Sequence, residues 1–243
     1  MAEQITLYTA KVCPYAHRAE IALAELGIEH TKYQIDLQNK PEWYAPKVNP
    51  ASKVPAITYG GPIVPPDEPS PESEKIAESL VLLEFFADLK PDSTFLPKDA
   101  ISRAKVRFFI DAISNKLSPA QNAFLRKGES PEALYKAFDY VQSLLPDNTK
   151  YAVSDNFTTA DAAIAPFFAR GGLALKNDFG AYKPGEGTKV LETLKSPKYA
   201  KLWGYWEAVL ERPSVKSTLD EEYLINLYKH RYQALREEKQ KAL

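Results

Sequence analysis

The chain has 243 residues, of which 44% are hydrophobic and 26% are charged, and its 31 basic and 32 acidic residues give a formal net charge of −1. This length is enough for one large or two modest domains whose cores need no disulfide or metal. The balance of charge predicts no long-range attraction to nucleic acid or anionic lipid. The single cysteine, Cys13, excludes an internal disulfide and a cysteine-rich zinc site, and no His, Asp and Glu residues have metal-ligand spacing, so we expect no metal.

Signals for export or membrane insertion are not evident in this sequence. The first residues lack a basic stretch followed by an apolar one, and no apolar run approaches the ~18 residues of a membrane span. We therefore expect a cytoplasmic protein that has neither a membrane nor a nucleic acid among its partners.

Strand and helix signals alternate through the first part of the chain. Residues 5–9, 30–36 and 54–59 are short runs of β-favouring side chains, so each is predicted to be a strand. Residues 14–26 carry apolar residues at helical spacing, begin with a proline and end before Gly27, which predicts a helix. This helix provides the crossover that a parallel pair of strands needs.

Two further helices complete the predicted α/β domain. Residues 41–48 are compatible with a short helix, and residues 73–89 show helical periodicity after a proline-rich loop over residues 60–71. Pro55 lacks the N–H that a strand interior uses, so we place it at a strand entrance, where the Val54–Pro55 bond is a candidate for the cis form. The domain is predicted to be a compact mixed sheet with helices.

The chain after residue 98 is predicted to be entirely helical. Residues 90–98 contain two proline turns and are predicted to be a linker. We therefore expect an α/β domain over residues 1–89 and an all-α domain over residues 99–243. The predicted helices of the second domain cover residues 101–117, 131–145, 158–171, 197–211 and 219–241.

Two local features are predicted inside the helical domain. Thr158 and Asp161 form a pattern like a capping box at the start of a helix, with Asp in the place of Glu. Residues 177–189 hold three glycines and a proline, and we expect a surface loop there.

Cys13 is the leading candidate for chemistry because of its place between a strand and a helix. The unpaired N–H groups and the macrodipole at a helix N-terminus favour a negative charge, and the thiolate is the nucleophilic form of cysteine. Residue 16 is alanine, so no Cys-x-x-Cys pair forms and a redox cycle needs a second thiol from another molecule. The alternative is a cysteine that packs as a small hydrophobic residue.

Four ordered motifs resemble those of the soluble glutathione transferases. Residues 13–18, Cys-Pro-Tyr-Ala-His-Arg, resemble the omega-class active-site turn, and residues 49–56 resemble the segment that ends in the family's cis-proline. Glu78 and Ser79 resemble the acidic–serine pair of the family, and residues 158–161 resemble the capping box of its helical domain. The resemblance implies the glutathione transferase fold: an α/β N-terminal thioredoxin-like domain plus an all-α C-terminal domain.

The same resemblance implies a glutathione site with assigned roles. Cys13 is the nucleophile. The backbone of Val54 pairs with the extended tripeptide, and Pro55 aims that backbone into the cleft. Glu78 pairs with the γ-glutamyl amine and Ser79 donates to the neighbouring carboxylate.

Four neighbouring side chains also have expected roles. Lys53 is expected to meet the glycyl carboxylate of glutathione. Tyr15 is expected either to contact glutathione or to pack in the protein. His17 and Arg18 are expected either to bring positive charge near the thiolate or to be solvated.

The resemblance also implies a hydrophobic second-substrate site contributed by the helical domain. That domain is rich in aromatic residues, most of which must be core, and we expect only one or two to line the site. The candidates are Phe108, Phe124, Trp203 and Tyr223. The implied partners are glutathione, a hydrophobic or aromatic small molecule and a second copy of the chain in a homodimer.

The predicted function is that of a glutathione-dependent thiol transferase and reductase, with glutathione as co-substrate. It would remove glutathione from glutathionyl adducts and reduce mixed disulfides through Cys13. Two alternatives stay open. One is a non-catalytic ligandin that binds aromatic or hydrophobic molecules, and the other is a conjugating transferase or glutathione-dependent lyase or isomerase. The glutathionyl-hydroquinone reductases share a Cys-Pro-aromatic-Ala turn but carry longer extensions.

Overall fold

The structure, a computed structural model, describes residues 3–241, with side chains described as far as residue 238. It divides into two compact units, each of which has its own core. The first unit comprises Met1–Leu96 together with Pro213–Leu219, and the second comprises Pro97–Arg212 together with Asp220–Leu243. Among the described helices, none combines the length and the apolar composition needed to cross a membrane.

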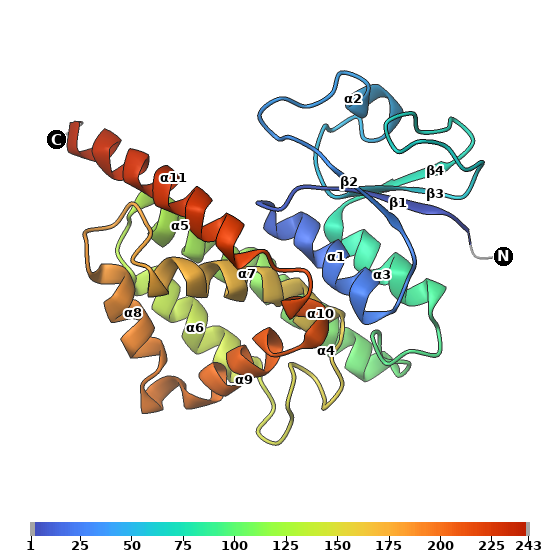
Figure 1. Cartoon of the computed structure of the whole chain (residues 1–243). Coiled ribbons are helices and arrows are strands. Elements are labelled where there is room, and N and C mark those ends of the chain that lie inside the picture. The colour runs from blue at the N-terminus through green and yellow to red at the C-terminus, as the bar shows by residue number, and fades with distance from the viewer. Residues whose placement is uncertain (1–2, 242–243) are drawn as a thin grey trace. The chain divides into compact units, whose positions relative to one another are not determined.

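The first unit is a four-stranded mixed sheet with helices. Its elements are β1 (Ile5–Thr9), α1 (Pro14–Glu25), β2 (Thr31–Gln34), α2 (Tyr44–Lys47), β3 (Ala56–Tyr59), β4 (Glu74–Ala77), α3 (Ser79–Leu89) and α10 (Pro213–Lys216). The strand order is β2-β1-β3-β4, with β1 parallel to β2 and the other two pairs antiparallel. Figure 1 shows α1 and α3 together on one face of this sheet and α2 on the other.

Most predicted elements of this unit are confirmed. The strand over residues 5–9 is β1, and the helix over residues 14–26 is α1, which ends beside Gly27 in the left-handed region at φ 58°. The Val54–Pro55 peptide bond is cis, as the sequence indicated, and it immediately precedes β3.

The continuous helix predicted over residues 73–89 is wrong in its first part. Glu74–Ala77 forms β4, and the helix is confined to α3. Ile76 has the spacing of an apolar helix residue, but it pairs with Ile57 of β3. Glu78, at φ 73°, then turns the chain into the helix. Periodicity over so short a run does not reveal a partner strand.

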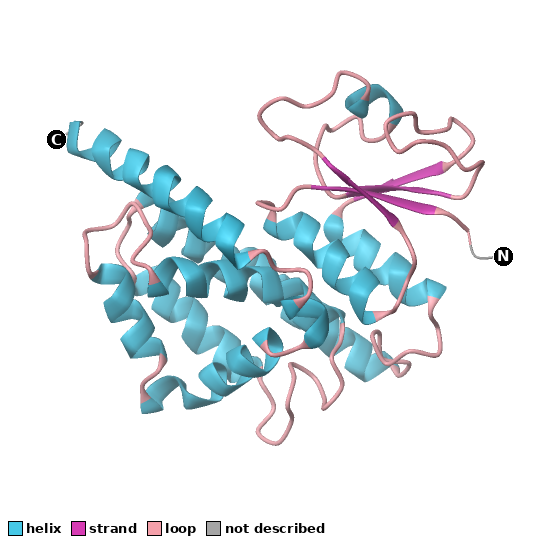
Figure 2. Ribbon diagram, viewed as in Figure 1, coloured by secondary structure: helices cyan, strands magenta, loops and turns pink. Residues whose placement is uncertain are grey.

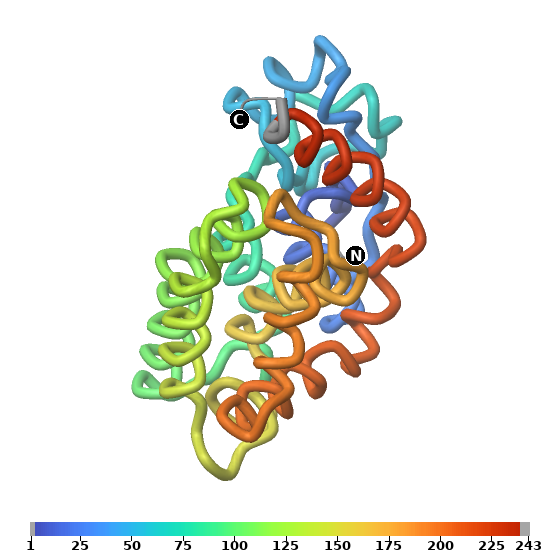
Figure 3. The backbone as a smooth tube through the Cα atoms, turned by 90° about the vertical axis from the view of Figure 1, so that its left-hand side faces the viewer, coloured from blue at the N-terminus to red at the C-terminus, as the bar shows by residue number. Residues whose placement is uncertain are grey.

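All the regular elements among the described residues of the second unit are helices, as predicted, and Figure 2 shows strands only in the first unit. Its elements are α4 (Ala100–Ala112), a π-helical turn (Ile113–Leu117), α5 (Ser118–Lys127), α6 (Glu132–Leu144), α7 (Thr159–Lys176), α8 (Glu186–Leu194), a 3₁₀ turn (Pro197–Tyr199), α9 (Ala200–Leu210) and α11 (Glu221–Lys241). α7 is the central helix and contacts α4, α5, α8, α9 and α11. Figure 3 shows α6 running beside the continuous helical stretch that α4, the π-helical turn and α5 form.

The start of α7 confirms the predicted capping box. The backbone N–H of Thr158 donates to Oδ2 of Asp161 at 2.7 Å, and the Thr158 side chain accepts from the helix backbone in return. Asp161 is fully buried and also accepts from the hydroxyl of Tyr205 at 2.8 Å. The box therefore ties the first turn of α7 to α9.

Two helices were not predicted in this unit. α5 follows α4 directly through the π-helical turn, and Pro119 lies in the first turn of α5. The surface loop predicted over residues 177–189 ends at Gly185, where α8 begins, and Tyr182 within it is buried. Asp178 accepts from the N–H groups of Gly185 and Gly187, so these two glycines belong to the start of α8 and not to a loop alone.

Candidate active site

Three turns that carry predicted site residues meet at one end of the sheet. Since β1 and β3 are antiparallel with Tyr8 opposite Ala56, the end of β1 lies beside the start of β3. Since β3 and β4 are antiparallel with Ala56 opposite Ala77, the start of β3 also lies beside the end of β4. The turn with Cys13, the turn with Val54 and the start of α3 are thereby brought together.

Cys13 is the N-cap residue of α1, and Pro14 occupies the first turn as predicted. The sulfur accepts a hydrogen bond from the N–H of Ala16 at 3.4 Å, and the thiol donates to the carbonyl oxygen of Val54 at 3.8 Å. The residue is half-buried. The sulfur is therefore held at a helix N-terminus, which favours the thiolate, while the residue keeps part of its surface exposed.

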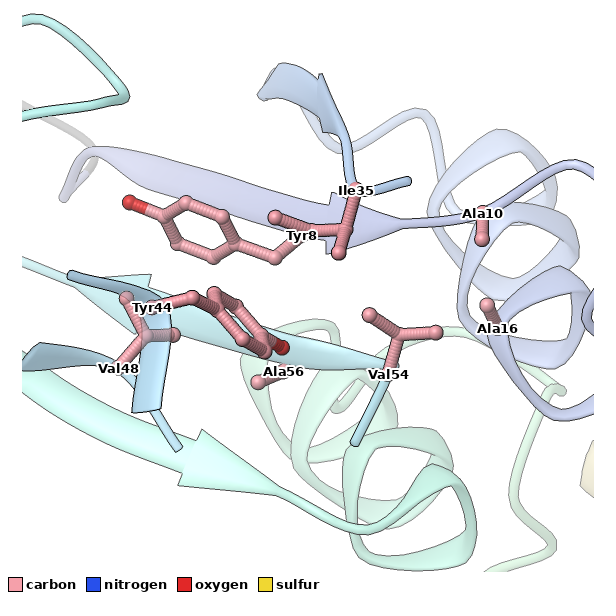
Figure 4. Close-up of a cluster of buried hydrophobic side chains, with 8 residues drawn as sticks. All are labelled: Tyr8, Ala10, Ala16, Ile35, Tyr44, Val48, Val54 and Ala56. Atoms are coloured by element: carbon pink, nitrogen blue, oxygen red, sulfur yellow. The ribbon is translucent and has the colours of Figure 1, made fainter. Parts of the chain in front are cut away.

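A hydrophobic cluster supports this end of the sheet. Its buried members, drawn in Figure 4, are Tyr8, Ala10, Ala16, Ile35, Tyr44, Val48, Val54 and Ala56. Cys13 and Val12 pack against the cluster from its edge. The figure places Ala10, Ala16 and Val54 together at one end. Cys13 therefore rests on an apolar base and also contacts the polar backbone of Val54.

Arg18 is buried one helical turn beyond the cysteine, which excludes the solvated alternative for this side chain. Its Nη1 donates to Oγ of Ser79 at 3.2 Å, and its guanidinium lies 5.4 Å from the ring centroid of Tyr15. Burial lowers the pKa of Arg18 to about 10, against the opposing effect of Tyr15 and Cys13. The guanidinium therefore stays charged at neutral pH and places a positive charge near the sulfur.

His17 is also buried, and its ring contacts the segment that follows α10. Nε2 of His17 lies 2.9 Å from Oγ1 of Thr218. Oγ of Ser214 donates to Oε2 of Glu25 at 2.7 Å. These contacts hold Pro213–Leu219, a segment that the sequence groups with the helical domain, against α1 of the first unit.

The remaining predicted glutathione residues lie on the same three turns with different exposure. Val54 and Ser79 are buried, whereas Lys53 and Glu78 are exposed. Tyr15 is 46% exposed, so it does not pack in the core. Val54 and Ser79 can therefore offer backbone and hydroxyl atoms for hydrogen bonds with a ligand. Lys53 and Glu78 can offer charged groups.

Two residues that the sequence analysis did not single out stabilise the turn before Val54. The hydroxyl of Tyr44 and Nδ2 of Asn49 both donate to the carbonyl oxygen of Lys53, at 2.7 and 2.8 Å. An Asn side chain that bonds to the backbone two residues on is a known turn signal, and Asn49 accepts from the N–H of Ala51 in this way.

The candidate residues of the hydrophobic second-substrate site come from four different helices of the second unit. Phe124 is fully buried and stacks on Tyr182 with ring centroids 4.4 Å apart, so it presents no surface to a ligand. The expectation that Phe124 lines the second-substrate site is therefore wrong in this structure, because its ring is packed in the core of the second unit. Trp203 is half-buried beside Trp206, and Phe108 and Tyr223 are exposed.

The fold and this site define a class of protein: a thioredoxin-like unit with a cysteine at the first helix N-terminus, followed in the chain by a helical unit. Among the described residues, no group of three His, Cys, Asp or Glu side chains is placed to hold a metal ion.

Comparisons with known proteins identify the family. The family model for the glutathione S-transferase N-terminal domain matches residues 12–89. The crystal structure of glutathione transferase Omega 1C from Trametes versicolor is 57% identical, with a TM-score of 0.93, over 96% of this chain and 98% of that chain. That of Omega 2S from the same organism in complex with 2,4-dihydroxybenzophenone is 42% identical, with a TM-score of 0.89, over 95% and 100%. Glutathione S-transferase omega-1 from Mus musculus is 27% identical over 173 residues, 69% of this chain and 67% of that protein.

The chain belongs to the glutathione transferase family, in its omega-like, cysteine-type class. This confirms the predicted resemblance and the predicted fold class. The function of the family is glutathione-dependent transfer, with glutathione as co-substrate and hydrophobic molecules as second substrates.

Proposed function

We propose that the chain is a glutathione-dependent thiol transferase and reductase in which Cys13 is the nucleophile. The observation that carries this proposal is the position of the Cys13 sulfur at the N-terminus of α1, where it accepts from the N–H of Ala16. A helix N-terminus and the nearby charge of Arg18 both favour the thiolate over the thiol. A nucleophile of this kind attacks sulfur directly instead of holding glutathione as the attacking group.

In the first step, the Cys13 thiolate attacks the glutathionyl sulfur of a mixed disulfide. A disulfide forms between Cys13 and glutathione, the original S–S bond breaks, and the substrate thiolate leaves and takes a proton from water. With a glutathionyl thioether next to a carbonyl, the same attack on sulfur breaks the C–S bond. The carbon keeps the electron pair as an enolate and is then protonated.

In the second step, a glutathione thiolate attacks the glutathionyl sulfur attached to Cys13. Oxidised glutathione forms and the Cys13 thiolate is regenerated. Overall the substrate is reduced by two electrons, which come from two glutathionyl sulfurs joined as a disulfide. The second thiol must come from another molecule because the chain has only one cysteine, and the proposal assigns it to glutathione.

Binding of the resolving glutathione uses the three turns around Cys13. The backbone of Val54 pairs with the cysteinyl residue of the tripeptide, next to the cis bond of Pro55. Ser79 is held by Arg18 at the start of α3 and donates to the γ-glutamyl carboxylate, while the exposed Glu78 pairs with the adjacent amine. Lys53 meets the glycyl carboxylate, and Tyr15 covers one side of the tripeptide.

Intact-mass measurement after exposure to oxidised glutathione tests the covalent step. The proposal expects one glutathione-sized mass increase that reduced glutathione removes. Because the chain has one cysteine, the site needs no further mapping, and Cys13→Ser provides a cysteine-free control. The proposal fails if no adduct forms, or if Cys13→Ser retains full thiol-transfer activity. Attack on an aryl halide that is unaffected by Cys13→Ser would favour a conjugating transferase.

A second candidate function is the binding of hydroxylated aromatic molecules. It is favoured by the structure of Omega 2S from Trametes versicolor, 42% identical to this chain, in complex with 2,4-dihydroxybenzophenone. Thermal-shift measurements with this compound on Cys13→Ser test it separately from catalysis. Stabilisation together with no turnover of any glutathionyl substrate by the wild type would support a ligandin.

The assembly and the compartment belong to the same proposal. We propose a homodimer that works in the cytoplasm, supported by the relationship to the glutathione transferases. Light scattering of the purified chain and fractionation of cells test these two points.

A further inference from the structure

The carbonyl oxygen of Lys53 is held by two buried side chains. The hydroxyl of Tyr44 donates to it at 2.7 Å and Nδ2 of Asn49 at 2.8 Å. Tyr44 has no exposed surface and Asn49 is 6% exposed. Both lone pairs of this oxygen are therefore used by donors that solvent does not compete with.

Both donors are themselves fixed. The side-chain oxygen of Asn49 accepts from the N–H of Ala51 at 3.1 Å, and the backbone carbonyl of Asn49 accepts from the N–H of Ser52 at 2.7 Å. The ring of Tyr44 packs against Tyr8, with centroids 5.7 Å apart. Burial raises the pKa of the Tyr44 hydroxyl above its ordinary value, so it remains a donor throughout the neutral range.

Holding the Lys53 carbonyl also fixes the next N–H group. The Lys53–Val54 peptide is planar and trans, so the N–H of Val54 points opposite to the C=O of Lys53 and away from Tyr44 and Asn49. The β3 ladder begins only at Ala56, and within the described part of the chain the Val54 N–H donates to no other group. The carbonyl of Val54 accepts from the thiol of Cys13.

We infer that Tyr44 and Asn49 are positioning residues for glutathione, because their two hydrogen bonds to Lys53 turn the Val54 N–H toward the tripeptide beside Cys13. The inference rests on the proposed function and adds two residues that contact neither the tripeptide nor the reacting sulfur. The turn needs such support because Ser52 lies in the left-handed region at φ 52°, which is unfavourable for a residue with a side chain. Without both donors the Lys53–Val54 peptide is able to rotate.

The test is calorimetric titration of the purified full chain with S-methylglutathione, which cannot form a disulfide with Cys13. Tyr44→Phe removes one donor and leaves the ring, and Asn49→Ala removes the other. The matched control is Tyr8→Phe, because Tyr8 belongs to the same cluster and its hydroxyl donates to the carbonyl of Pro66 at 2.8 Å. Thermal midpoints and the pH profile of Cys13 alkylation are measured for every variant.

We expect Tyr44→Phe and Asn49→Ala each to raise the dissociation constant about two- to tenfold, the size of one net hydrogen bond. Tyr8→Phe should lower the thermal midpoint about as much as Tyr44→Phe does. It should leave the dissociation constant within about twofold of the wild-type value. The alkylation profile should not move, because neither residue contacts the sulfur. A KM effect on glutathione without an equal fall in kcat would agree with this role.

Two outcomes would overturn the inference, and they differ in what they say of the proposed function. If the wild type binds S-methylglutathione and Tyr44→Phe and Asn49→Ala bind it as well as Tyr8→Phe does, the two residues only stabilise the fold. If the wild type does not bind it at all, the proposed glutathione site fails and the inference fails with it.

Discussion

Arg18 donates from Nη1 to Oγ of Ser79 at 3.2 Å, although 61 residues separate the two in sequence. The bond joins the helix that carries Cys13 to the helix whose first residue is assigned to the γ-glutamyl carboxylate. One buried guanidinium is therefore near both the nucleophile and the anion-binding end of the proposed site. Loss of its charge should affect both.

Arg18→Gln is expected to slow alkylation of Cys13 by iodoacetamide at neutral pH. Removal of a nearby positive charge disfavours the thiolate, so the midpoint of the rate–pH profile should rise by about 0.5–1 pH unit. Arg18→Lys keeps the charge and should shift the profile less. An unchanged midpoint in Arg18→Gln, in a variant that remains folded by circular dichroism, would show that the helix N-terminus alone determines the reactivity.

Glu78→Gln is expected to weaken glutathione binding about tenfold, because a charge-assisted hydrogen bond to the γ-glutamyl amine is replaced by a neutral one. The thermal midpoint should stay the same because Glu78 is exposed. The matched control is Glu74→Gln, an exposed carboxylate on neighbouring β4. Equal dissociation constants for the two variants would remove Glu78 from the site.

Asp161→Asn is expected to reduce the free energy of unfolding by about 2–4 kcal/mol, as measured by urea denaturation. The buried carboxylate accepts from the N–H groups of Ala152 and Thr158 and from the hydroxyls of Thr158 and Tyr205. An amide nitrogen cannot accept, so at least one buried donor loses its partner. Thr158→Ser keeps the hydroxyl and should cost far less. A loss below about 0.5 kcal/mol in Asp161→Asn would mean that the network rearranges.

The protein is expected to lose stability above pH 10, partly through Tyr8. Burial raises the pKa of Tyr8 to about 12, from an ordinary value of 10.0. Below pH 10 both states keep this proton, whereas between pH 10 and 12 the unfolded chain releases it first, so stability falls as pH rises. The loss of stability from this group reaches about 2 kcal/mol at pH 12. Thermal midpoints from pH 8 to 11.5 should decline less steeply for Tyr8→Phe, and parallel curves would contradict this assignment.

Much of the fold and the centre of the site follow from local sequence. A strand followed by Cys13-Pro14 and an apolar helical stripe predicts the N-cap geometry that the structure has, because a helix start depends on a few adjacent residues. The bond between Thr158 and Asp161 spans three positions and is predictable for the same reason. The place of Glu78 and Ser79 came from resemblance and not from periodicity, which gave the wrong element for Glu74–Ala77.

The amino-acid sequence alone determined where the cysteine helix begins, where the chain turns at Pro55 and that the second half is helical. Only the tertiary structure decided that Arg18 is buried against Ser79, that Phe124 fills a core, and that Tyr44 and Asn49 hold the carbonyl of Lys53. The reason is the range of the interactions. Caps and turns are formed by hydrogen bonds within a few residues, whereas burial and strand pairing depend on partners that only the folded chain brings into contact.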